Sequence, residues 1–138
     1  MFEAYFIDLG WLLFALFFGV AMGSMTGLIP GFHVNNVALI LLALSPVFLD
    51  WGIPLSAVAA IIVSTGTVHT FLNYIPSALL GAPDGDTALS LLPGHRMLLS
   101  GNASRGVAYS ARGSQLGLFL SLPLIIVARI AFGDDLGW

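Results

Sequence analysis

The sequence predicts an all-α integral membrane protein that forms a single membrane domain over residues 1–138. Of its residues, 58% are hydrophobic and only 8% are charged, and the mean hydropathy is +0.99. So little polar surface cannot cover a soluble domain of this size. The apolar residues also gather in about four blocks, several of them near the roughly 20 residues that cross the hydrocarbon core of a bilayer. A multi-pass protein in the lipid bilayer of the plasma membrane is therefore expected.

Charge and cysteine content exclude several kinds of function. The formal net charge is -3 and the chain has no basic run, so no nucleic acid partner is expected. With no cysteine, the chain can form neither disulfides nor thiolate sites.

The first apolar block, residues 9–29, is long enough to span the membrane. Glu3 and Asp8 stand where a cleaved signal peptide would carry basic residues, so this block is expected to remain as a helix. Gly19, Gly23 and Gly27 recur every fourth residue on one face, a pattern that lets membrane helices pack closely.

Pro30 and Gly31 then break the first helix, because proline lacks a backbone N–H and disfavours helical geometry before it. His33, Asn35 and Asn36 follow this break. A plain turn and a re-entrant segment both remain open here. The second block, residues 34–49, is interrupted by proline and is expected to cross only partially or at a tilt.

The third block, residues 54–82, is predicted to break over 65–76, where polar residues and Pro76 interrupt the apolar sequence. The fourth block, residues 106–132, is long enough to cross and contains Pro123, a predicted kink. Gly113 and Gly117 in this block are predicted to serve helix packing.

A polar insert, residues 83–105, separates the third and fourth blocks. Its Arg96 and Arg105 predict a cytoplasmic location by the positive-inside rule. Two short helical turns are expected within it, separated by Pro93 and Gly94.

A substrate site is expected where the two breaks come together. A broken helix exposes backbone N–H groups and the positive end of a helix dipole, which hold an anion without a buried cation. Capping of helix ends and ordinary packing would also explain these polar side chains. The residues predicted to bind substrate are Asn35, Asn36, Thr65, Gly66, Thr67, His69, Asn73 and His33.

Several motifs in order resemble the TctA membrane subunit family of tripartite tricarboxylate transporters. The first is G-x-x-x-G-x-x-P-G at residues 23–31, followed by an apolar run that ends in Ser45-Pro46. Further matching points are Gly66-Thr67, Asn73 to Pro76, Asp86 to Ala88, Pro93 to Met97, Gly101 and Ala103 to Ala108.

The resemblance implies half of an inverted-repeat-type transporter with two broken or re-entrant helices. It implies transport of a small organic anion of the carboxylate class, with coupling to Na⁺ or H⁺ left open. It also implies an extracytoplasmic binding protein or a small membrane subunit as partners. The chain resembles only the first half of such subunits, so a homo-oligomer, most simply a dimer, is expected unless the chain is a shortened descendant or part of a longer protein.

The sequence departs from the family pattern after the first break, where Pro30-Gly31 is followed by a phenylalanine and His33 in place of the usual small residues. Two other classes of protein remain open. A non-transporting assembly or scaffold subunit fits the glycine faces. A metalloenzyme would need a ligand motif that the three histidines do not form, so no enzyme, metal or other cofactor is expected.

Overall fold

The computed structural model describes residues 2–81 and 88–132, and every element in these ranges is a helix. An all-α protein is therefore confirmed for the described chain. The helices are α1 (Phe2–Leu28), α2 (Val34–Ala43), α3 (Ser45–Asp50), α4 (Leu55–Leu72), α5 (Tyr74–Leu80), α6 (Ala88–Leu99) and α7 (Ala103–Phe132).

Three apolar stretches in the described chain are long enough to cross a membrane: Leu9–Leu28, Leu55–Leu80 and Ala103–Phe132. The second predicted block is divided into α2 and α3 at Leu44, and proline stands in the first turn of α3. Proline is tolerated there because the first-turn N–H groups lack helical partners. Neither part of this block is long enough to span the membrane as a regular helix.

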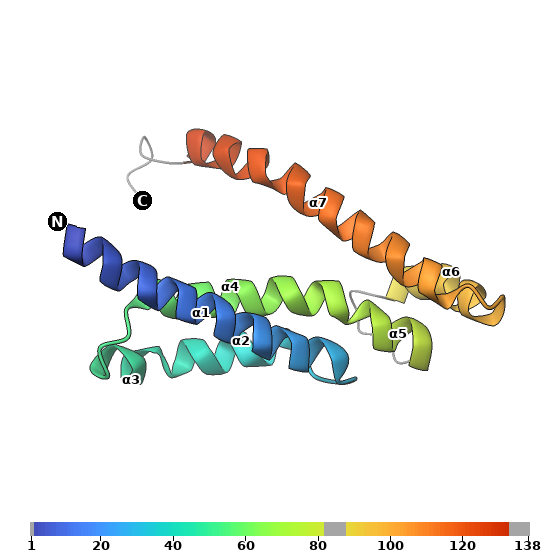
Figure 1. Ribbon diagram of the computed structural model, residues 1–138, viewed down its shortest axis with the longest axis horizontal. Helices are drawn as coiled ribbons and strands as arrows, with labels where there is room; N and C mark the ends of the chain where they lie inside the picture. The colour runs from blue at the N-terminus through green and yellow to red at the C-terminus, as the bar shows by residue number, and fades with distance from the viewer. Residues whose placement is uncertain (1, 82–87, 133–138) are drawn as a thin grey trace.

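Helix α4 lies at the centre of the fold and contacts α1, α2, α3, α5 and α7. Helices α1 and α4 run in the same direction and pack against each other, and α2 and α3, which connect them in sequence, run back in the opposite direction beside α4 (Figure 1). The start of α1, α3 and the end of α7 therefore lie toward one end of the molecule. The Pro30-Gly31 turn, α5 and α6 lie toward the other end.

The prediction of a break over residues 65–76 is corrected by the structure. Helix α4 continues to Leu72, and the interruption is confined to Asn73, which keeps nearly helical dihedrals of φ -64° and ψ -19°. The polar residues of this stretch do not interrupt the helix, because the hydroxyls of Thr67 and Thr70 are satisfied within it; for example, Thr67 donates to the carbonyl of Val63 at 2.8 Å. Pro76 falls in the first turn of α5, so it shapes the junction without ending the helix pair.

The two short turns expected in the polar insert are likewise corrected. Helix α6 runs from Ala88 through Pro93 and Gly94 to Leu99. Gly101, just beyond its end, has a φ of +75° that suits glycine, and Asn102 N–H donates to the Met97 carbonyl at 2.7 Å. The segment before α6, residues 82–87, lies outside the described residues.

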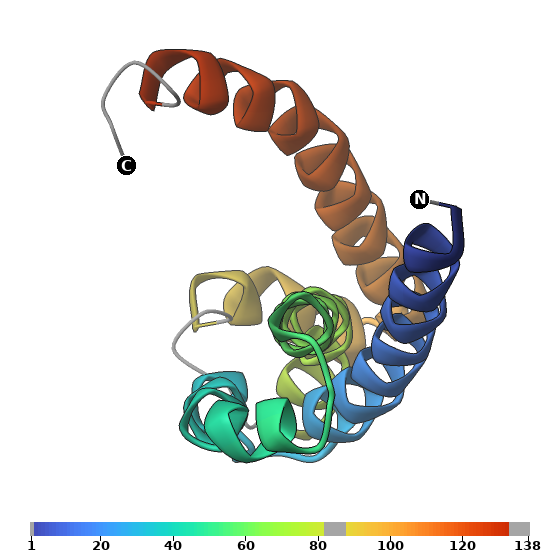
Figure 2. The ribbon, with the colours of Figure 1, turned by 90° about the vertical axis from the view of Figure 1, so that its left-hand side faces the viewer.

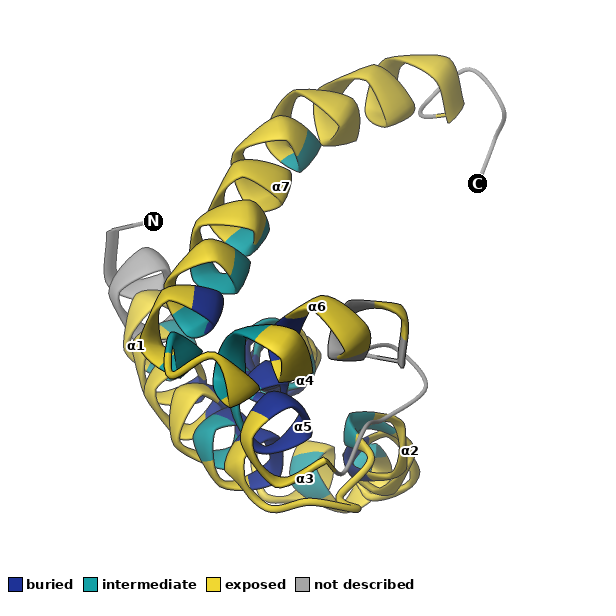
Figure 3. Cartoon of the chain, turned by 90° about the vertical axis from the view of Figure 1, so that its right-hand side faces the viewer, coloured by how far each residue is buried: buried dark blue, intermediate teal, exposed yellow. Residues whose placement is uncertain are grey.

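Burial is concentrated on α4 and α5, whereas α7 contacts α4, α5 and α6 but is largely exposed (Figures 2 and 3). The apolar core joins three helices and comprises Ala15, Val37, Leu41, Ala57 and Ile61. None of the apolar window of α7 is buried. The buried polar side chains, which are the candidates for a binding site, are therefore found mainly on α4 and its neighbours.

Candidate intramembrane polar site

The glycine face of α1 lies directly against α4. A Cβ atom built on Gly23 would be 2.6 Å from the Thr65 carbonyl oxygen, and one on Gly27 would be 2.9 Å from the Leu72 Cβ. A Cβ on Gly19 would collide with the Ser64 hydroxyl. Glycine at these positions therefore allows the two backbones to approach more closely than any other residue would.

A row of buried polar residues, here called the polar stripe, runs along α4 and α5. Its members are Thr65, His69, Asn73 and Ser77, whose exposed fractions are 1%, 3%, 4% and 2%. They share one face because residues four apart on a helix lie above one another. The stripe crosses the α4–α5 junction unbroken because Asn73 keeps helical dihedrals and donates its N–H to the His69 carbonyl at 2.8 Å.

Helix α1 adds one polar side chain to the stripe. The Nδ1 atom of His69 lies 3.1 Å from the Thr26 hydroxyl oxygen, and both residues are buried. Ser77 Oγ donates to the Asn73 carbonyl at 2.7 Å. The hydroxyl of Thr65, in contrast, has no hydrogen-bond partner among the described residues. A buried hydroxyl without a hydrogen bond is unfavourable by about 1–3 kcal/mol. A polar group of a ligand that bound beside Thr65 would therefore be stabilising.

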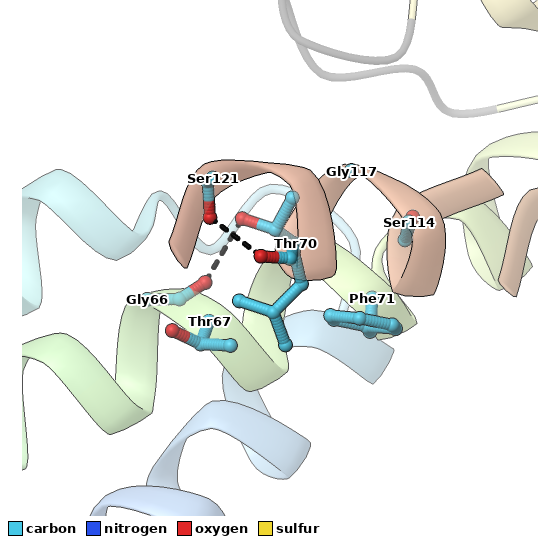
Figure 4. Close-up of a pocket in the computed structure, with 8 residues that line it drawn as sticks. Gly66, Thr67, Thr70, Phe71, Ser114, Gly117 and Ser121 are labelled. Carbon is cyan, nitrogen blue, oxygen red and sulfur yellow. Dashed lines mark hydrogen bonds between the residues drawn. The ribbon is translucent and has the colours of Figure 1, made fainter. Parts of the chain in front are cut away.

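The other side of α4 faces a groove shared with α7 (Figure 4). The groove has a volume of about 350 Å³. Two of its hydroxyl groups donate to carbonyls of their own helices, Thr70 to Gly66 at 2.9 Å and Ser121 to Leu118 at 2.7 Å. The remaining lining residues are Thr67, Phe71, Ser114 and Gly117.

The predicted substrate residues of α4 thus fall into two groups. Thr65, His69 and Asn73 belong to the buried polar stripe, whereas Gly66 and Thr67 line the groove beside α7. Because α4 stays helical through these positions, Thr67 and His69 point to different sides, and the single cavity expected from a broken segment does not include both.

The predicted residues near the first break lie at the beginning of α2. His33 is the residue before the helix, with φ -85° and ψ 121°, and Asn35 and Asn36 occupy the first turn. All three are exposed. The break itself lies at Pro30 and Gly31, where α1 has ended and Gly31 has a φ of +84°.

Sequence reasoning missed Thr26 and Ser77. Ser77 follows Asn73 by one helical turn, so the period of the stripe could have identified it once α4 and α5 were read as nearly continuous. Thr26 stands beside Gly27 on the packing face of α1, but its contact with His69 depends on the distance between two helices that the sequence does not state.

The glycines at positions 113 and 117 are not packed against other described residues, since a Cβ on either would meet no atom within 4 Å. The described residues also contain no group of three or more histidine, aspartate or glutamate side chains placed to hold a metal ion.

Comparison with known proteins identifies the family. The sequence model described as "Tripartite tricarboxylate transporter TctA family" matches residues 13–134. The uncharacterized protein MJ1079 of Methanocaldococcus jannaschii is 39% identical over 111 residues, which cover 80% of this chain and 26% of the relative. The chain thus spans about a quarter of the length of the curated relative that it matches. No solved structure matches the chain. Since the family match covers nearly all of the described helices, this chain belongs to the TctA family of tripartite tricarboxylate transporters.

Proposed function

We propose that this chain forms part of a membrane transport subunit that carries a small organic anion, most simply a carboxylate, across the plasma membrane. The observation that supports it is the buried polar stripe Thr65, His69, Asn73 and Ser77, which lies within a stretch long enough to cross the bilayer. Polar side chains inside membrane helices are unfavourable and mark substrate or ion pathways. Membership of a tricarboxylate transporter family supports a carboxylate as the substrate.

In this proposal the anion binds near the two interruptions of the helices. The first turn of α2 offers backbone N–H groups and the positive end of a helix dipole. The start of α2 and the α4–α5 junction lie toward the same end of the molecule (Figure 1), which favours a shared site. The residues proposed to contact the substrate at this site are His33, Asn35, Asn36, Thr65, His69 and Asn73. Gly66 and Thr67, which line the groove beside α7, are proposed to contact it on the other side of α4.

Counterflow in proteoliposomes tests the proposal. The purified chain is expected to exchange labelled di- or tricarboxylates in a saturable manner. Asn73→Ala and Asn36→Ala are each expected to weaken substrate binding by about 1–3 kcal/mol, because each removes an amide partner of the anion. Gln115→Ala, which removes an exposed amide on α7, serves as the control and should leave binding unchanged. Exchange of no carboxylate, together with thermal stabilisation by cations or neutral solutes alone, would contradict the proposal.

A scaffold subunit is the second candidate, and the open glycines on α7 favour it. An unpacked small-residue face on a membrane helix suits association with another helix. A pure scaffold would show no carboxylate flux at any substrate concentration but would still assemble with its partners.

The proposed partners are a second copy of the chain, an extracytoplasmic binding protein and a small membrane subunit. A homodimer would cover the exposed face of α7, of which no part of the apolar window is buried. Native mass spectrometry from lipid nanodiscs would detect the dimer, and a monomer that retains transport would exclude it as a functional requirement.

A further inference from the structure

The first turns of α7 carry two arginines and a tyrosine on the side that faces away from the rest of the protein. Arg105, Tyr109 and Arg112 are spaced by four and three residues, so they share one side of the helix, here called the arginine face. All three are exposed. The more buried residues of these turns lie on the opposite side and are Gly106, Val107, Ser110 and Ser114. The arginine face is therefore directed toward the surroundings of the protein and not toward its core.

The distribution of charge along α7 places this face at the membrane boundary. Arg112 and Arg129 enclose an uncharged stretch, residues 113–128, which is about 24 Å long at 1.5 Å per residue. This length approaches the roughly 30 Å of the hydrocarbon core, and the long arginine side chains extend from it toward water. Arg112 thus lies at the edge of the hydrocarbon. Tyr109 and Arg105 lie about 4.5 Å and 10.5 Å further along the axis, among the lipid headgroups.

The helices beside the arginine face supply no carboxylate to its two guanidinium groups. Helix α7 contacts α4, α5 and α6. Within the bounds given above, none of these four helices contains an aspartate or a glutamate. An anion that reaches Arg105 and Arg112 therefore meets two positive charges and no competing acidic group on these helices.

We propose that the arginine face binds the phosphate of an anionic phospholipid. Arg112 and Arg105 interact with the phosphate oxygens, and the Tyr109 hydroxyl between them donates a hydrogen bond. Side chains on a helix lean toward its N-terminus, so Arg112 extends from the edge of the hydrocarbon toward Tyr109 and the headgroups. Arginine suits this role because its guanidinium group can donate two parallel hydrogen bonds to a phosphate. The inference does not depend on the proposed transport function.

The deeper part of the same side of α7 favours a phospholipid over a free phosphate ion. Leu116 and Phe119 continue the spacing of four and three residues beyond Arg112, and both are exposed. They lie within the uncharged stretch, at the depth of the acyl chains. One continuous side of the helix thus presents cations to a headgroup and apolar side chains to the chains attached to it.

Native mass spectrometry of the full chain in detergent tests the proposal, with an equimolar mixture of phosphatidylglycerol and phosphatidylcholine that have the same acyl chains. The natural chain is expected to retain one phosphatidylglycerol in preference to phosphatidylcholine. Arg105→Gln and Arg112→Gln should each weaken this binding about fivefold, and the double variant about 25-fold, which corresponds to about 1 kcal/mol per arginine. Arg96→Gln serves as the matched control, because Arg96 is exposed on α6 toward the same end of the molecule (Figure 1). It should leave the preference unchanged.

Three results would overturn the proposal. The first is equal retention of the two lipids by the natural chain. The second is a loss in Arg96→Gln as large as that in Arg112→Gln, which would show a response to net charge alone. The third is displacement of phosphatidylglycerol by an equal concentration of glycerol 3-phosphate, which would identify a site for free phosphate esters. Size-exclusion chromatography in detergent identifies any variant that fails to fold, and if the double variant fails, the two single variants decide.

Discussion

The hydroxyl groups of α4 fall into two kinds. Those of Ser64, Thr67 and Thr70 donate to carbonyls one turn earlier, for example from Ser64 to Ala60 at 2.6 Å. Such bonds satisfy a polar side chain within its own helix, as membrane helices require. Thr65 is buried without such a bond. A residue that is unfavourable for stability and adjoins an ionisable side chain is expected to serve function.

Thr65→Val tests this interpretation at the level of one residue. Valine has nearly the shape of threonine, so the substitution removes the unsatisfied hydroxyl and is expected to stabilise the protein by about 1 kcal/mol or more. Thr26→Val removes a hydroxyl that bonds to both Gly23 and His69, and it should destabilise the protein by about 1–3 kcal/mol. Thermal unfolding in detergent, followed by circular dichroism, measures both effects. Equal destabilisation by the two variants would show that Thr65 has a partner.

At the scale of elements, the pairing of α1 with α4 depends on the absence of side chains on one helix. The built Cβ of Gly23 would meet the backbone carbonyl of Thr65, which cannot rotate away as a side chain could. The apolar face of α7, in contrast, contains Gly117 with no atom near its built Cβ. The same residue type thus has opposite roles on the two helices.

Alanine substitutions are therefore expected to have opposite signs on α1 and α7. Gly23→Ala should force α1 away from α4 and destabilise the protein by about 1–3 kcal/mol. Gly117→Ala should stabilise it by roughly 0.5–1 kcal/mol, because alanine is the better helix former and has space there. Reversible unfolding in mixed micelles compares the two. If Gly23→Ala left the free energy of unfolding unchanged, the close contact between α1 and α4 would not contribute to stability.

At the scale of the whole molecule, charged residues divide between the two ends. Asp50 at the end of α3 and Arg129 in the last turn of α7 lie toward one end, whereas Arg96 in α6 and Arg105 at the start of α7 lie toward the opposite end, which therefore carries more arginine (Figure 1). Arginine near the ends of membrane helices favours the cytoplasmic side. The turn between α6 and α7 should therefore face the cytoplasm.

The absence of native cysteine makes this orientation directly measurable. Asp50→Cys and Ser100→Cys place single thiols at exposed positions at the two ends. In intact cells a membrane-impermeant maleimide is expected to label Asp50→Cys, whereas Ser100→Cys should be labelled only after permeabilisation. The reverse pattern would invert the orientation, and labelling of both variants in intact cells would place both ends on one side.

Composition and the length of the apolar blocks were enough to predict an all-α membrane protein. The lipid bilayer requires apolar spans of this length whatever their tertiary contacts. The end of α1 was also predictable, since Pro30 and Gly31 act locally. The predicted extent of the second interruption was wrong, because the hydroxyls of Thr67 and Thr70 bond to carbonyls of their own helix and so do not require a break there. The partnership of Thr26 with His69 could not be predicted, because it depends on how closely two distant helices approach.

The parallel pairing of α1 and α4 also sets the order in which the protein can assemble during synthesis. Thr26 and His69 are 43 residues apart, and α2 and α3 must turn back before α4 can reach α1. At a translation rate of about 5–20 residues per second, the ribosome needs roughly 2–9 seconds to synthesise the residues between Thr26 and His69. The glycine face of α1 therefore remains without α4 for about this time. During this interval membrane proteases and chaperones encounter α1 as an unpaired helix, so sequence changes in α4 will first appear as altered survival of the nascent chain.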